Sequence, residues 1–265
     1  MCVPEPVPGV ERLFVHAALV SLVGAVIFGF GGWLPAPPST LPVAPSLTST
    51  AVDGIPDPCL AKHPWPAKST PAQTKVAMQK AFGLQLTGSG WTDPQSRGLV
   101  KIVWETLDAL SCTPYLADVR RHSGQSVIKI HAGPTRSWAW GDWGLTNPGR
   151  LTFDFAKWRS AYPSDKGRLV RIVVHELGHL HQMGANPAGA SFGPLYNRYG
   201  SFSNYGGYSR SETMSEVMGY YVARCAQDNP YDEAGPAERA YYAWARTTIF
   251  GGVEFGPEVG SQPAC

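Results

Sequence analysis

The sequence predicts an α+β fold in which a small sheet packs on a buried helix and further helices complete the domain. Three observations favour it. Two short stretches, 126–131 and 150–155, show the polar–apolar alternation of strands. Several longer stretches carry apolar residues three and four positions apart, which is the helical period. One of them, around 173–180, is apolar nearly all round, so we expect it to lie inside the domain.

The N-terminal part of the chain does not have the pattern of a packed domain. Residues 13–34 are almost entirely apolar and carry no formal charge, which is enough to span a bilayer as a helix. We expect 1–34 to be an uncleaved membrane anchor or, as the alternative, a cleaved signal segment. Residues 35–58, rich in Pro, Ser, Thr and Ala, are expected to form a linker. The folded domain is then 59–265, extracytoplasmic and either membrane-anchored or secreted.

Charge and composition argue against a nucleic-acid partner. Lys and Arg total 22 against 20 Asp and Glu, and no basic run interleaved with aromatic residues occurs. Nine Trp, eleven Tyr and ten Phe suit an extracellular binding surface as well as a core. We expect a monomer that acts on a peptide or protein and touches a membrane only through its N-terminal segment.

The cysteines agree with export. Cys2 precedes the apolar segment, and the domain holds four more, an even number that suggests two disulfides. We predict the pairings Cys59–Cys112 and Cys225–Cys265, because each closes a local unit; free buried thiols are the alternative. No Cys-x-x-Cys spacing occurs, so a cysteine-ligated zinc site is not expected.

The first half of the domain reads as two helices followed by the two strands. Residues 74–82 predict a short helix, and Asp93-Pro94 opens a longer one. The apolar stripe of the longer helix consists of Leu99, Val100, Val103, Trp104, Leu107 and Leu110. Between the strands, a Gly-rich loop carries Trp138, Trp140 and Trp143. These rings could form a substrate-binding wall or could pin the loop onto the sheet, and the sequence favours neither.

The buried helix carries the residues that we expect to bind a metal ion. We expect it to start near Ser164 or Asp165, either of which could cap it, and to stop at Gly184. His175 and His179 lie four residues apart and therefore share one helix face, where two imidazoles can bind one Zn²⁺. Leaving such groups buried without a partner would cost several kcal/mol, so a metal is more plausible than a chance pair of core histidines.

Glu176 flanks that face, where a general base for a zinc-activated water belongs. His181 lies on the other side of the helix and is predicted to be structural. The polar stretch 185–210 predicts a long loop, which would be functional or mobile. The helices predicted next are 211–226 and 237–248.

Two glutamates of the 211–226 helix, Glu212 and Glu216, stand four residues apart. A solvated face is the ordinary explanation. The alternative is that Glu212 completes a zinc site and Glu216 hydrogen-bonds a ligand imidazole. Gly219, at the next turn, would let this helix approach the histidine helix closely.

The longer metzincin motif is absent, because it needs Gly and His where Gln182 and Ala185 stand. The pattern instead resembles the gluzincins, within them the group that includes the anthrax lethal factor catalytic domain and the Pro-Pro endopeptidases. The residues that carry the resemblance are His175-Glu-Leu-Gly-His179 and, further on, Tyr205-Gly-Gly-Tyr-Ser-Arg-Ser-Glu212-Thr-Met-Ser-Glu216. Ser215-Glu216 departs from the usual Ala-Glu.

The resemblance implies a zincin-like metallopeptidase domain with one Zn²⁺. It implies that the metal ligands are His175, His179 and Glu212, with Glu216 behind them. Glu176 would be the base, and Tyr205 would steady the oxyanion, with Tyr208 as the next candidate. The expected activity is zinc-dependent hydrolysis of peptide bonds; an exported zinc-containing binding domain without catalysis and a peptidoglycan cross-link hydrolase are the alternatives.

Overall fold

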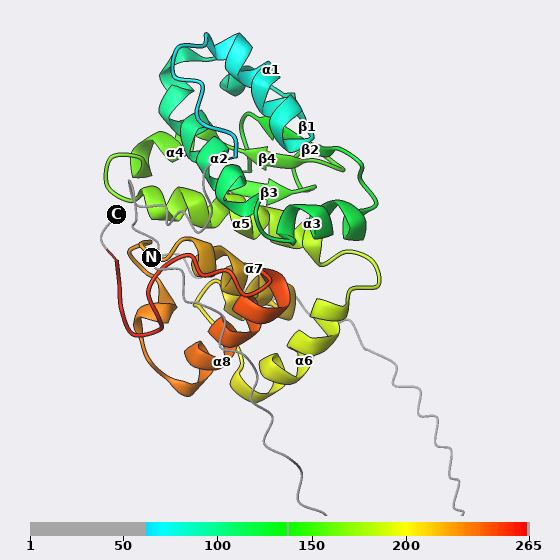
Figure 1. Ribbon diagram of the computed structural model, residues 1–265, viewed down its shortest axis with the longest axis vertical. Helices are drawn as coiled ribbons and strands as arrows, with labels where there is room; N and C mark the ends of the chain where they lie inside the picture. The colour runs from blue at the N-terminus through cyan, green and yellow to red at the C-terminus, as the bar shows by residue number, and fades with distance from the viewer. Residues whose placement is uncertain (1–61, 137, 264–265) are drawn as a thin grey trace, which may run out of the picture. The chain divides into compact units, whose positions relative to one another are not determined.

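The computed structural model describes residues 62–136 and 138–263, which form an α+β fold (Figure 1). The described α-helices are α1 (Pro71–Phe82), α2 (Arg97–Leu110), α3 (Tyr115–Ser123), α4 (Phe155–Ala161), α5 (Lys166–His181), α6 (Pro187–Tyr199), α7 (Arg210–Val222) and α8 (Pro236–Trp244). The described strands are β1 (Leu84–Thr87), β2 (Ile128–Ala132), β3 (Gly141–Trp143) and β4 (Leu151–Phe153).

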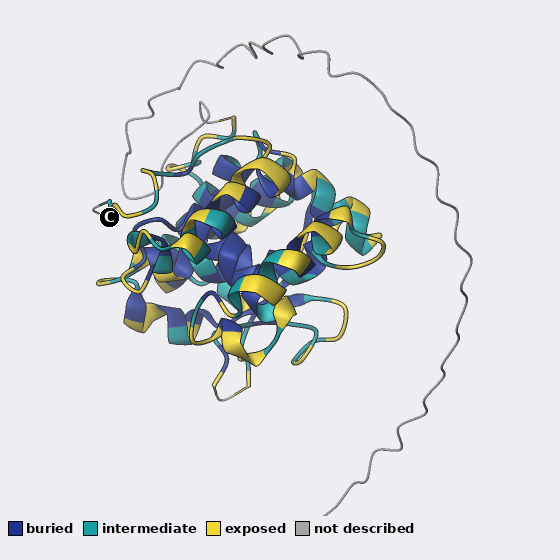
Figure 2. Cartoon of the chain, turned by 90° about the horizontal axis from the view of Figure 1, so that it is seen from below, coloured by how far each residue is buried: buried dark blue, intermediate teal, exposed yellow. Residues whose placement is uncertain are grey.

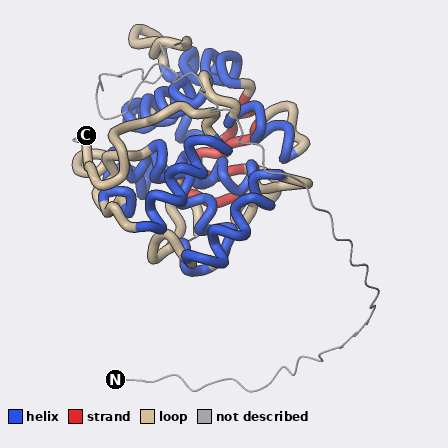
Figure 3. The backbone as a smooth tube through the Cα atoms, turned by 60° about the horizontal axis from the view of Figure 1, so that its bottom comes forward, coloured by secondary structure: helices blue, strands red, loops and turns tan. Residues whose placement is uncertain are grey.

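The four strands form one mixed sheet, shown in red in Figure 3. Their order is β1-β2-β4-β3. β1, β2 and β4 are parallel, whereas β3 runs antiparallel to β4 and places Asp142 opposite Thr152. Figure 1 shows α1 above the sheet, α2 at the height of the strands and α5 crossing below them, with α6, α7 and α8 beyond α5. α2 contacts α5. β3, at the end of the sheet, contacts α5, so an edge strand lies beside the predicted site helix.

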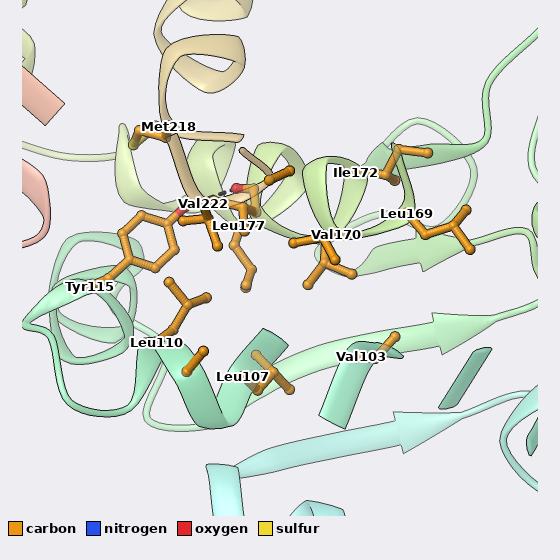
Figure 4. Close-up of a cluster of buried hydrophobic side chains, with 14 of the residues drawn as sticks. Val103, Leu107, Leu110, Tyr115, Leu169, Val170, Ile172, Leu177, Met218 and Val222 are labelled. Carbon is orange, nitrogen blue, oxygen red and sulfur yellow. Dashed lines mark hydrogen bonds between the residues drawn. The ribbon is translucent and has the colours of Figure 1, made fainter. Parts of the chain in front are cut away.

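The buried residues lie in the interior of the fold (Figure 2), where α5 contacts α2, α3, α4, α7 and β3. Side chains from α2, α3, α5 and α7 meet there, among them Leu107, Leu177 and Met218, which are fully buried (Figure 4). The buried Tyr115 ring lies in the same cluster, and its hydroxyl donates a hydrogen bond of 2.8 Å to the Val174 carbonyl. The site helix is therefore held by packing around most of its circumference, as its all-round apolar pattern predicts.

α5 begins where the side chain of Asp165 accepts a hydrogen bond from the Arg168 amide at 2.9 Å, which satisfies a free helix N–H. Glycines allow α5 and α7 to pack closely. A Cβ on Gly219 would lie 3.0 Å from the Arg171 carbonyl oxygen, and one on Gly178 would lie 3.0 Å from Ser215 Oγ. The predicted role of Gly219 is thus confirmed.

Several predicted elements are confirmed with shifted ends. The helices expected at 74–82 and 211–226 are α1 and α7, and the strand expected at 126–131 is β2. The helix opened by Asp93-Pro94 begins with a short 3₁₀ turn and continues as α2. The helix expected at 237–248 is α8 followed by a π-helical turn, Ala245–Ile249.

The loop predicted at 185–210 is wrong, because most of its first half is α6. Asn186 caps this helix by accepting a hydrogen bond from the Ala188 amide, and Pro187 occupies the first position, which suits proline. Phe192 is buried against Tyr241 and Trp244 of α8. Tertiary burial of this ring thus overrides the Gly-, Ser- and Asn-rich composition.

The strand predicted at 150–155 is too long. It ends at Phe153, because Asp154 accepts a hydrogen bond from the Lys157 amide and starts α4 there. β1, β3, α3 and α4 were not predicted from the sequence. Each is short, and a strand of three or four residues shows too little alternation to be recognised.

The anchor or signal segment 1–34 and the linker 35–58 lie outside the described residues. Within the described part of the chain, no helix is long and apolar enough to span a membrane. Cys112 and Cys225 are disulfide-bonded. Cys59 and Cys265 also lie outside the described residues, so the pairings Cys59–Cys112 and Cys225–Cys265 stay predictions.

Candidate metal centre

Three side chains from α5 and α7 converge on one point. His175 Nε2 and His179 Nε2 are 3.2 Å apart. Glu212 Oε2 lies 3.0 Å from the first and 3.5 Å from the second. Among the described residues, these form the group of His, Cys, Asp and Glu side chains that could hold a metal ion. The two histidines come from successive turns of α5, and the glutamate comes from the first turn of α7.

The spacing of these atoms fits a tetrahedral ion. Ligands about 2.0–2.2 Å from such an ion lie about 3.3–3.6 Å from one another, close to the distances found. Glu212 Oε2 is buried and has no hydrogen-bond partner of acceptable geometry in the described parts of the chain. Such an orphaned acceptor beside two imidazole nitrogens is costly unless a cation or a proton lies between them. The residues present therefore fit Zn²⁺.

The carboxylate of Glu216 fixes the orientation of His175 from behind. Glu216 is fully buried, and its Oε1 accepts hydrogen bonds from His175 Nδ1 at 2.8 Å and from the Arg171 guanidinium at 2.6 Å. Because Nδ1 donates to the carboxylate, Nε2 is the nitrogen left to bind a cation when the ring is neutral, and it points toward His179 and Glu212. The structure thus brings Glu212 and Glu216 to two different nitrogens of one ring.

The charged side chains of this cluster shift one another's pKa values toward the charged forms. Burial by itself would lower the pKa of His175, but the carboxylates of Glu212 and Glu216 outweigh burial and raise it to about 9. Burial would raise the pKa of Glu212, but the two imidazoles hold that pKa well below its ordinary value. Burial acts likewise on Glu216, whose pKa is nevertheless lowered by His175 and Arg171. In the metal-free protein a proton on His175 therefore takes the place that a cation would fill.

Glu176 lies beside the three atoms and is not one of them. It is buried, packs under Gly141 of β3, and lines two adjoining cavities of about 180 Å³ and about 220 Å³. Burial raises the pKa of its carboxyl, which the neighbouring histidines partly oppose. No described group hydrogen-bonds to this carboxylate. A group in such a position can take up and release a proton next to a bound substrate.

Tyr205 lies beside His175. Its ring centroid is 5.6 Å from that of His175, and it lines both cavities. Burial and then the negative charge of Glu212 raise the pKa of the Tyr205 phenol, so its hydroxyl stays protonated. Tyr208 is 79% exposed, contacts the Tyr205 ring and lines neither cavity. Of the two tyrosines, Tyr205 is the one placed near the predicted metal ligands.

The three tryptophans of the loop before β4 have different surroundings. Trp140 is pinned: the Arg168 guanidinium lies 4.4 Å from its ring centroid, and its carbonyl accepts a hydrogen bond from the Trp158 indole. Trp138 is 62% exposed and lines both cavities, and Trp143 lines the second. Trp140 also lines the first cavity, and both Trp140 and Trp143 pack against the core. These two rings therefore fit both interpretations of the loop, whereas Trp138 fits only the wall of the cleft.

The structure also places His181 and two residues that contact Glu216. His181, predicted to be structural, is buried and stacks on Tyr115, and burial lowers its pKa to about 3. Glu216 also binds Arg171 and Ser203, neither of which was predicted from the sequence. Arg171 could have been found, because it precedes His175 by four residues on the same helix face. No local pattern in the sequence indicates that Ser203 binds Glu216.

No protein-family model, no curated protein and no solved structure matches the chain.

Proposed function

We propose that this protein is an exported or membrane-anchored zinc-dependent endopeptidase with a zincin-like fold. The observation that carries the proposal is the convergence of two imidazoles from α5 and one carboxylate from α7 within 3.0–3.5 Å of one another. Three protein ligands leave a fourth position open, as catalytic zinc sites require, whereas structural sites are closed by a fourth protein ligand.

In the proposed mechanism, each residue of the cleft has a separate chemical role. His175, His179 and Glu212 would hold the ion, and bound Zn²⁺ lowers the pKa of water and polarises a carbonyl. Glu176 takes the proton from the attacking water and passes it to the leaving amine. The Tyr205 hydroxyl donates a hydrogen bond to the oxyanion that develops on the substrate.

The cleft suits an extended peptide. The two cavities meet at Trp138, Gly141, Glu176 and Tyr205, so together they form a path across the site. Gly141 belongs to the edge strand β3. A peptide lying in the cleft would run beside this strand, whose backbone groups can add hydrogen bonds.

Chelation tests the proposal on the purified full chain. We expect one zinc ion per chain and cleavage of a mixed peptide library, which a chelator abolishes and added Zn²⁺ restores. Cleavage that persists after the zinc has been removed would overturn the proposal. A zinc-loaded protein that cleaves no peptide, and that chelation unfolds, would indicate the non-catalytic zinc domain instead.

Zinc binding should depend on pH. Because the pKa of His175 in the metal-free fold is about 9, that ring is protonated at neutral pH and must lose a proton to bind zinc. We expect zinc affinity to rise about tenfold per pH unit between pH 6 and 8 and to level off above pH 9. Calorimetric titrations in buffers of different ionisation enthalpy would measure the proton released. An affinity independent of pH over this range would contradict the assignment.

A further inference from the structure

The fully buried Glu216 carboxylate connects the metal centre to the loop that carries Tyr205. Its Oε1 is shared by His175 and Arg171, whereas its Oε2 accepts a hydrogen bond from the Ser203 hydroxyl at 2.8 Å. Both oxygens are therefore used, and they face two different parts of the chain: one oxygen faces α5, and the other faces the loop before α7.

The Ser203 hydroxyl also organises that loop. Its oxygen accepts a hydrogen bond from the Gly206 amide at 3.0 Å, which closes the turn around Tyr205. The Gly206 carbonyl in turn accepts a hydrogen bond from Thr213 of α7 at 2.7 Å. A Cβ on Gly206 would lie 3.2 Å from Thr213 Cα, so the turn rests directly on α7.

These bonds form a continuous path from a metal-ligand ring to the loop. A hydroxyl can donate one hydrogen bond and accept another at the same time, and at this position it does both. We infer that Ser203 is a positioning residue, which holds Tyr205 in a fixed place relative to His175 through the carboxylate of Glu216. The kinetic consequence for Tyr205 rests on the proposed function; the structural coupling does not.

The coupling must act in both directions. A cation held by Nε2 of His175 together with His179 and Glu212 would fix the His175 ring, and with it the direction of the Nδ1–H bond to Glu216. A firmly held Glu216 then favours the loop conformation in which Ser203 bonds to it, and by linkage an ordered loop favours cation binding. We therefore expect zinc to order the segment 203–209, although Ser203 itself binds no metal.

Hydrogen exchange measured by mass spectrometry on the full chain tests this. In the wild type, Zn²⁺ should slow exchange of the amides in 203–209 relative to chelator-treated protein. In Ser203→Ala this segment should exchange about tenfold faster, with the zinc effect lost, because both hydrogen bonds are gone. Ser203→Thr, which keeps the hydroxyl, should restore protection. Ser201→Ala, an exposed serine two residues away, is the matched control.

Kinetics supply the second measurement. Ser203→Ala should bind zinc at wild-type stoichiometry and lower kcat about tenfold with KM nearly unchanged, because the misplaced group acts in the transition state. Zinc-dependent protection of 203–209 that persists in Ser203→Ala would overturn the inference. Absence of this zinc-dependent protection in the wild type would also overturn the inference. That wild-type measurement remains decisive even if Ser203→Ala does not fold. A wild type that shows the protection but cleaves no peptide would instead refute the proposed function alone.

Discussion

Glu176→Gln is expected to abolish peptide hydrolysis while zinc stays bound. The amide has nearly the shape of the carboxyl but cannot take up a proton, and loss of a general base lowers kcat by about 10²–10⁴-fold. Because Glu176 is not among the three converging ligand atoms, zinc stoichiometry should be that of the wild type. Steady-state kinetics on a cleaved peptide and metal analysis of the same sample measure both quantities.

The stability of this variant separates chemistry from folding. Burial raises the pKa of Glu176, which means that the fold disfavours its charged form, so a neutral Gln should not lower the melting temperature. Glu258→Gln, an exposed residue outside both cavities, is the control. Turnover by Glu176→Gln at the wild-type rate would show that another group is the base.

Glu212→Ala and Glu216→Ala are expected to weaken zinc binding to different degrees and for different reasons. Removing Glu212 deletes one of the three proposed ligands and should lower zinc affinity by more than about 100-fold, whereas partners that only orient a ligand are worth about 10–100-fold. A competition titration with a chromogenic chelator measures both affinities. A larger loss in Glu216→Ala would mean that the two carboxylates have exchanged roles.

Without zinc, Glu216→Ala should lose more folding stability than Glu212→Ala. This is the reverse of the order expected for zinc affinity. The Glu216 carboxylate is buried against the largely buried Arg171 guanidinium. Deleting one partner of such a pair leaves a buried charge and costs about 3–5 kcal/mol. Glu212 is partly exposed, so its loss should lower the free energy of unfolding far less. Urea denaturation in the presence of a chelator makes the comparison without any contribution from zinc.

Local spacing was enough to predict some features. Residues four apart on a helix must share a face, so His175 and His179 could be paired before any fold was known. The all-round apolar pattern of α5 predicted its burial. By contrast, α6 was missed, because its helical state depends on Phe192 packing against rings of α8. Nothing within 187–199 encodes those partners.

What the sequence determined by itself is the pair of imidazoles on a buried helix and, through the resemblance, the two glutamates to examine. Only the tertiary structure decided that Glu212 reaches the imidazoles and that Glu216 lies behind His175, bound to Ser203. The physical reason is that the two features depend on residues at different distances along the chain. Helical periodicity is a property of neighbouring residues, whereas the separation of α5 and α7 is set where Gly178 and Gly219 let two distant helices touch.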